Sequence, residues 1–303
     1  MIYEYALEPE MVATWGTLHN SRFFIREFGM GQGRIVSRYP KKWAKKVWEA
    51  FVEGSDNHND RRRMVELLVR LQETMIVREG CCWDDSNGNW LKNALLEHTR
   101  YPFKAILAKN NPENRPEILA EDALSVSPCP GWDNPHGITV KRKAHDMAAA
   151  VRRMLTCCRW VKFIDPYFSQ CKHGHKQSII AFLNILKNER PLELSRTVEI
   201  HASGDGATID YLKDFFEKII PVGTQVTIYQ WQERLGGQRL HNRYILTDLG
   251  GVSFSHGLDA GGDGETDDIN RLDHEQYIYR CKEYDPAAPA FDEASKPLTI
   301  TGR

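Results

Sequence analysis

LHNRYILTD, at residues 240–248, is the stretch that says most about fold and function. Its β-branched and aromatic residues favour a strand. Side chains two positions apart share one face of a strand, so we expect His241 and Arg243 to project together. An imidazole beside a permanent guanidinium charge suits attack on a phosphodiester, because one group does the chemistry while the other holds the charged oxygens. His241 and Arg243 are therefore the leading candidates for catalytic residues.

The chain on both sides of this stretch alternates between strand and helix patterns. This alternation predicts an α/β layered sandwich built on a mixed sheet. Helices are expected at 145–157, 178–187 and 210–220, and further strands at 161–165, 197–202, 225–231, 252–256 and 274–281.

The N-terminal part of the chain has a different pattern. Helical periodicity is expected at residues 41–51, 61–75 and 89–98. Residues 110–136 then contain many prolines and other breakers, which predicts a connector. We therefore expect two domains: a mainly helical recognition or partner-binding domain at 1–130 and an α/β domain at 131–303.

Bulk composition limits the possible classes of protein. A chain of 303 residues has room for two cores. Forty basic residues against forty-one acidic ones exclude a global basic field, so nucleic-acid binding would depend on local patches. Adjacent cysteine pairs argue against a disulfide framework. The start of the chain lacks a signal-peptide pattern, and no apolar run approaches the ~20 residues that span a bilayer. We expect a soluble, cytoplasmic protein with no membrane partner.

The second half resembles the phospholipase D superfamily. The signature of that family is His-x-Lys followed by four residues and Asp. His241, Arg243 and Asp248 match the spacing, with Arg in place of Lys. The segment FIDPYF at 163–168 is similar to the family's opening strand. The resemblance covers roughly residues 140–285.

The resemblance implies a mechanism and several roles. His241 would attack phosphorus and form a phosphohistidine, while a second histidine protonates the leaving oxygen. Arg243 would stabilise the developing charge, so no metal and no cofactor are expected. Asp248 would support the hairpin. Glu275, predicted on the last strand, would orient His241.

The chain has one such motif, although the mechanism needs two histidines. Residues 98–100, His-Thr-Arg, are followed by Ala105 where the aspartate belongs, which excludes them as a second copy. Single-motif members of the family pair two chains, so the resemblance implies a homodimer with a shared site. It also implies a nuclease that acts on DNA or RNA. By analogy with single-motif members, the expected role is bacterial anti-phage or restriction defence, with a further defence protein as an additional partner.

Two departures from the family pattern leave alternatives open. Arg243 is a bulky planar fork where the family has a compact ammonium. Ser255 and His256, the candidate substrate-binding residues, replace the family's Gly-Ser-x-Asn turn. An inactive nucleic-acid-binding or scaffold subunit is therefore the main alternative. A phosphatidyl-transfer enzyme is a third.

Other candidates have both a functional and a structural interpretation. Asp165 is either a turn former before Pro166 or a polar wall of the substrate pocket. A basic cluster interleaved with two tryptophans either grips a nucleic-acid backbone or forms a solvated helix face. The acidic run at 259–273 and the segment CKHGH at 171–175 lack a complete metal-ligand pattern. The basic cluster consists of Lys41, Lys42, Lys45 and Lys46.

Overall fold

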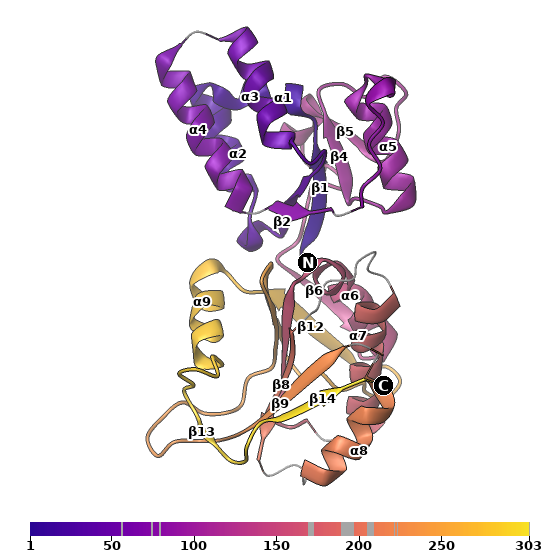
Figure 1. Cartoon of the computed structure of the whole chain (residues 1–303), viewed down its shortest axis with the longest axis vertical. Helices are drawn as coiled ribbons and strands as arrows, with labels where there is room; N and C mark the ends of the chain where they lie inside the picture. The colour runs from indigo at the N-terminus through magenta and orange to yellow at the C-terminus, as the bar shows by residue number, and fades with distance from the viewer. Residues whose placement is uncertain are drawn as a thin grey trace. The chain divides into compact units, whose positions relative to one another are not determined.

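The computed structural model describes the chain from residue 1 to 302 except at 56, 74, 79, 169–172, 189–196, 205–208, 221 and 223. The chain divides into two compact units, each described by itself (Figure 1). The N-terminal unit is Ile2–Pro135. The C-terminal unit is His136–Arg303 together with Met1. The units thus divide between Pro135 and His136, whereas the sequence-based division was placed at 130/131.

The N-terminal unit contains a wholly parallel sheet of five strands. The sequence-based expectation of a mainly helical domain missed this sheet, although helices contain more of the unit's described residues than strands do. The sheet order is β3-β2-β1-β4-β5. Its strands are β1 (Tyr3–Leu7), β2 (Arg34–Arg38), β3 (Met75–Val77), β4 (Ala105–Ala108) and β5 (Ile118–Ala120).

Helices cover both faces of this sheet, and two separate cores result. Tyr5 and Leu7 point into one core with Trp15 and Trp43, whereas Ala6 points into the other with Trp90. Figure 1 shows α5 on the opposite side of the sheet from α3 and α4. The helices are α1 (Pro9–Ala13), α2 (Leu18–Glu27), α3 (Trp43–Gly54), α4 (His58–Glu73) and α5 (Trp90–Arg100).

The strands of the N-terminal unit give little signal in the sequence because they are short and buried on both faces. β4 is AILA, and all four of its residues are buried. A strand inside a parallel sheet has no solvated face, so polar and apolar residues do not alternate along it. Periodicity cannot separate such a run from a buried piece of helix.

The C-terminal unit is built on a mixed sheet, as the sequence predicted. Its strand order is β13-β9-β8-β7-β10-β11-β12-β6, with β14 paired to β9. The strands β7, β8 and β9 are parallel, and the others pair antiparallel. The strands are β6 (Gly137–Lys141), β7 (Trp160–Ile164), β8 (Thr197–Ser203), β9 (Gln225–Gln232), β10 (Tyr244–Thr247), β11 (Gly250–Phe254), β12 (Thr266–Arg271), β13 (Asp292–Glu293) and β14 (Leu298–Thr301).

Helices also lie on both faces of the mixed sheet. Figure 1 shows α9 (His274–Glu283) across the sheet from α6 (Ala144–Cys157), α7 (His173–Asn188) and α8 (Ile209–Ile219). No helix in the described part of the chain has the length and apolar character needed to cross a bilayer.

Residues 274–281 were predicted as the last strand, and this prediction was wrong because they form α9. The aromatic and β-branched residues in HEQYIYRC favour a strand locally. The start of the helix is fixed by a capping box instead. The side chain of Asp273 accepts from the backbone N–H of Gln276, and the Gln276 side chain accepts from the backbone N–H of Asp273.

Candidate active site

The candidate catalytic pair lies just before β10 and not within it. His241 and Arg243 occupy the segment that leads into the strand at Tyr244. The backbone N–H of Phe254 donates to the Arg243 carbonyl at 3.1 Å, so the pairing of β10 with β11 extends to this residue. The start of β10 faces the carboxyl end of β7, because Tyr244 pairs antiparallel with Ile164. The pair therefore lies at the edge where β7 ends.

Tyr167 joins the two members of this pair. Its hydroxyl lies 2.7 Å from Nδ1 of His241, and the two rings meet edge to face. The guanidinium carbon of Arg243 lies 4.7 Å from the centre of the Tyr167 ring, within the range of a cation–π contact. His241 is exposed, whereas Nε of Arg243 is buried and has no hydrogen-bond partner among the described residues. One aromatic side chain thus fixes the imidazole and supports the cation.

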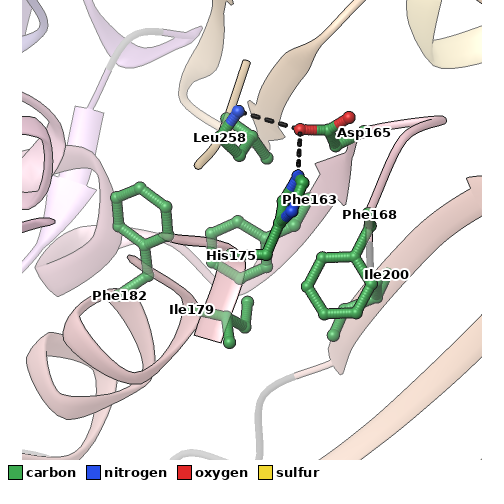
Figure 2. A pocket seen from close by; sticks show the side chains of 8 residues that line it. All are labelled: Phe163, Asp165, Phe168, His175, Ile179, Phe182, Ile200 and Leu258. Atoms are coloured by element: carbon green, nitrogen blue, oxygen red, sulfur yellow. Dashed lines mark hydrogen bonds and ion pairs between the residues drawn. The ribbon is translucent and has the colours of Figure 1, made fainter. Parts of the chain in front are cut away.

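Asp165 shapes the turn that presents Tyr167. One of its carboxylate oxygens, Oδ1, accepts from the backbone N–H of Tyr167 at 2.9 Å. The other, Oδ2, accepts from the backbone N–H of Leu258 at 2.9 Å and lies 3.4 Å from Nε2 of His175 (Figure 2). Asp165 is 2% exposed. It therefore acts as a buried turn former, and it also lines a small cavity.

That cavity is apolar and has a volume of about 10 Å³. Such a space holds about one water molecule, so it is too small for a substrate group. Figure 2 shows His175 reaching from α7 toward the Asp165 carboxylate, between aromatic rings. The lining residues are Phe163, Asp165, Phe168, His175, Ile179, Phe182, Ile200 and Leu258.

Asp165, His175 and Asp259 form a group of potential metal ligands among the described residues. Their ligand atoms lie within 4.8 Å of one another. The guanidinium of Arg142, however, lies 2.9 Å from the Asp259 carboxylate and already supplies a positive charge there. A cation would have to displace that ion pair, so the group fits a metal poorly. Cys171 and Lys172, from the other candidate metal segment, lie outside the described residues.

Ser255 and His256 follow β11 at the same edge of the sheet. Their backbone N–H groups both donate to Oδ1 of Asp267 at 3.0 Å. Asp267 is 1% exposed, and both side chains of the turn are exposed. The buried carboxylate therefore holds the backbone of the turn. The Ser255 hydroxyl donates to the Asp268 carbonyl at 3.1 Å, and Nδ1 of His256 lies 3.5 Å from Oδ1 of Asp267, so both exposed side chains already have partners.

Asp248 lies at the far end of β10 from His241. Its carboxylate accepts from the backbone N–H of Arg159 at 2.7 Å. This contact attaches the β10–β11 hairpin to the start of β7. The location fits the supporting role that the sequence suggested and excludes direct contact between Asp248 and a substrate bound at His241.

Glu275 does not reach His241, and its predicted orienting role was wrong. It occupies the exposed first turn of α9. That end of the helix lies by the hairpin, since the hydroxyl of Tyr277 donates to the Thr247 carbonyl at 2.6 Å. Tyr167 makes the contact with His241 that was expected from Glu275. A tyrosine directly after an Asp-Pro pair carries no established sequence signal of this role.

The four lysines do not share one helix face. Lys41 and Lys42 lie in the turn before α3, whereas Lys45 and Lys46 lie within it. Lys41, Lys42 and Lys46 line a pocket, and Lys45 instead pairs with Glu49 at 3.3 Å.

His201 is a buried structural residue. Its Nδ1 accepts from Nε1 of Trp231 at 3.0 Å, and its Nε2 lies 3.0 Å from the Glu199 carboxylate. Burial lowers its pKa, although Glu199 acts in the opposite direction. The carboxylate of Glu199 also pairs with Lys162 at 2.9 Å. This network lies in the sheet core and leaves His201 without access to substrate.

Comparison with known proteins adds no family assignment. The chain matches no protein-family model, and a search of curated proteins finds no match. Any statement about activity therefore depends on the geometry of the site and on the sequence motif.

Proposed function

We propose that this protein is a metal-independent phosphodiesterase of the phospholipase D type, with His241 as its nucleophile. The observation that carries the proposal is the contact between Tyr167 and Nδ1 of His241, with Arg243 stacked beside them. When Nδ1 carries the proton and donates to the tyrosine oxygen, the lone pair of Nε2 is free to attack phosphorus. The guanidinium then lies near the oxygens that gain charge in the transition state.

The proposed reaction has two steps. Nε2 of His241 forms a bond to phosphorus, the bond to the leaving oxygen breaks, and a second imidazolium gives that oxygen a proton. Water then attacks the phosphohistidine, the second histidine takes a proton from it, and the phosphorus–nitrogen bond breaks. Arg243 stabilises the equatorial oxygens in both steps. No described contact assigns the second histidine.

We infer nucleic acid as the substrate and a homodimer as the active form. A site exposed at a sheet edge suits a polymer with repeated phosphodiesters, and the phospholipase D-like motif occurs once in the chain. In a two-fold dimer each chain would supply one His241. His256 is the alternative second histidine within one chain, since it is exposed at the same edge. A role in bacterial defence stays a proposal by analogy.

The test compares wild type with His241→Ala and His256→Ala on bis(p-nitrophenyl) phosphate and on single-stranded DNA, with EDTA present. Hydrolysis by wild type and its loss in His241→Ala would support the proposal. Equal rates for wild type and His241→Ala would overturn it. No hydrolysis by wild type, combined with DNA binding that depends on Arg243, would favour the inactive binding subunit instead.

The shared site has its own readout. Phosphohistidine trapped in an alkaline denaturant should amount to about one label for every two chains, and the chain should sediment as a dimer. Both catalytic histidines would belong to one chain if wild type is a fully active monomer and if His256→Ala is as inactive as His241→Ala.

A further inference from the structure

A pocket in the N-terminal unit lies where two parallel strands end. β2 ends at Arg38 and β3 ends at Val77, and these two residues pair with each other. The carboxyl ends of parallel strands are where open α/β sheets bind ligands, and this pocket lies at that end of the sheet, to one side of the reversal in strand order between β1 and β4. The pocket has a volume of about 760 Å³, within the ~300–1,000 Å³ typical of small-molecule sites. Its position and size therefore fit a bound small molecule.

The charge on the pocket wall is strongly positive. Among the residues that the structure describes, five of the lining side chains are basic and one, Asp85, is acidic. Arg78 is neutralised, because its guanidinium forms buried ion pairs with Glu4 at 2.7 Å and Glu97 at 3.0 Å. Four basic groups remain, and none of them has a carboxylate partner among the residues that the structure describes. They are Arg38, Lys41, Lys42 and Lys46.

An aromatic side chain completes the wall. Nε1 of Trp83 donates to the Asp85 carboxylate at 2.7 Å, which fixes the orientation of the indole. The ammonium of Lys46 lies 5.2 Å from the centre of the Trp83 ring. Val77, on the same wall, is 50% exposed. The pocket thus offers an aromatic and apolar surface next to a cluster of cations.

We propose that this pocket binds a nucleoside phosphate. The phosphates would contact Arg38, Lys41 and Lys42, and the base would pack against Trp83 and Val77. Burial raises the pKa of the Cys81 thiol in the same wall, so that group stays neutral and does not repel the phosphates. This site is separate from the one at His241 and does not depend on its activity.

The test titrates the full chain with ADP by calorimetry. ADP should bind, and adenosine and pyrophosphate should each bind more weakly, because each contacts part of the wall. The double variant Lys41→Glu/Lys42→Glu should weaken ADP binding by at least about tenfold. Lys45→Glu is the matched control, because Lys45 pairs with Glu49 and does not line the pocket.

Three results would overturn the proposal. The first is a failure of ADP to bind at concentrations up to about 1 mM. Lys45→Glu could weaken binding as much as the double variant, which would indicate a diffuse charge effect. A short single-stranded oligonucleotide could displace ADP and bind more tightly with the same dependence on Lys41 and Lys42, which would make the pocket part of a strand-binding surface. Hydrolysis of bis(p-nitrophenyl) phosphate by wild type reports on the His241 site, and ADP binding reports on this pocket, so failure of one proposal is distinguishable from failure of the other.

Discussion

The hydroxyl of Tyr167 lies 2.7 Å from Nδ1 of His241, and the two residues belong to segments 74 positions apart in the chain. Tyr167 is held by a turn after β7, and His241 lies three residues before the start of β10. Because β7 and β10 pair antiparallel, the end of one strand meets the start of the other. The proposed nucleophile is therefore oriented by an aromatic hydroxyl in place of a carboxylate.

Replacing Tyr167 with Phe should lower kcat by about tenfold, with a smaller effect on KM, because groups that orient a catalytic imidazole have effects of this size. Tyr167 is 46% exposed, so the free energy of unfolding should change little. Steady-state kinetics and urea unfolding measure the two quantities. Tyr211→Phe, at a tyrosine that is 52% exposed on α8, is the control. Equal kinetics for Tyr167→Phe and wild type would argue against the orienting role.

Arg243→Ala should lower kcat/KM by about 100-fold or more, since it removes charge stabilisation from the transition state. Arg243→Lys should retain most activity, because an ammonium keeps the charge although it loses the planar fork over Tyr167. The exposed Arg239, just before the motif, provides the control Arg239→Ala. If Arg243→Lys is as inactive as Arg243→Ala, the planar guanidinium is itself required and the family's lysine is not an adequate substitute here.

Glu275→Gln should leave the rate and its pH profile unchanged. The carboxylate lies in the exposed first turn of α9, at the hairpin end of β10, and it does not contact His241. A small loss of stability is expected, because an acidic group near a helix N-terminus contributes about 0.3–1 kcal/mol. The comparison requires a pH–rate profile for each protein. A shift of the profile in Glu275→Gln would restore the role that the sequence suggested.

The C-terminal unit should lose stability as the pH falls below about 6.5, because of His201. Burial lowers the pKa of this imidazole below its ordinary value of 6.5. The unfolded chain then binds a proton that the folded chain does not, so acid favours unfolding from that pH down to the folded pKa. Glu199 adds a separate effect. Burial raises its pKa, but hydrogen bonds and charge contacts with His201 and Lys162 outweigh burial and lower the pKa below 4.5, so its contribution is lost in stronger acid.

Urea unfolding between pH 8 and pH 5, with fluorescence detection, tests this dependence. His201→Gln should be less stable at pH 8 and should show a flatter dependence below about pH 6.5. His145→Gln is the control, because the His145 side chain is 82% exposed. An unchanged slope in His201→Gln would assign the pH dependence to another group.

The sequence was informative where local pattern and packing agree. The strands at 160–164, 197–203 and 225–232 alternate with helices, and each was predicted with small errors at its ends. Helix α9 was mistaken for a strand because its aromatic residues favour β structure locally, while the capping box at Asp273 and packing against the hairpin favour a helix. The parallel sheet of the N-terminal unit was missed because strands such as β4 are buried on both faces.

By itself, the sequence determined that this chain has an α/β part with a mixed sheet and that His241 and Arg243 lie close together, because both follow from short-range pattern and spacing. Only the tertiary structure decided their surroundings. The pairing of β7 with β10 places Tyr167 next to His241. The position of α9 places Glu275 at the hairpin end of β10. In the N-terminal unit, Lys41, Lys42 and Trp83 line one pocket. Such contacts join residues far apart in the chain, and their geometry depends on sheet register and helix packing, which no local pattern encodes.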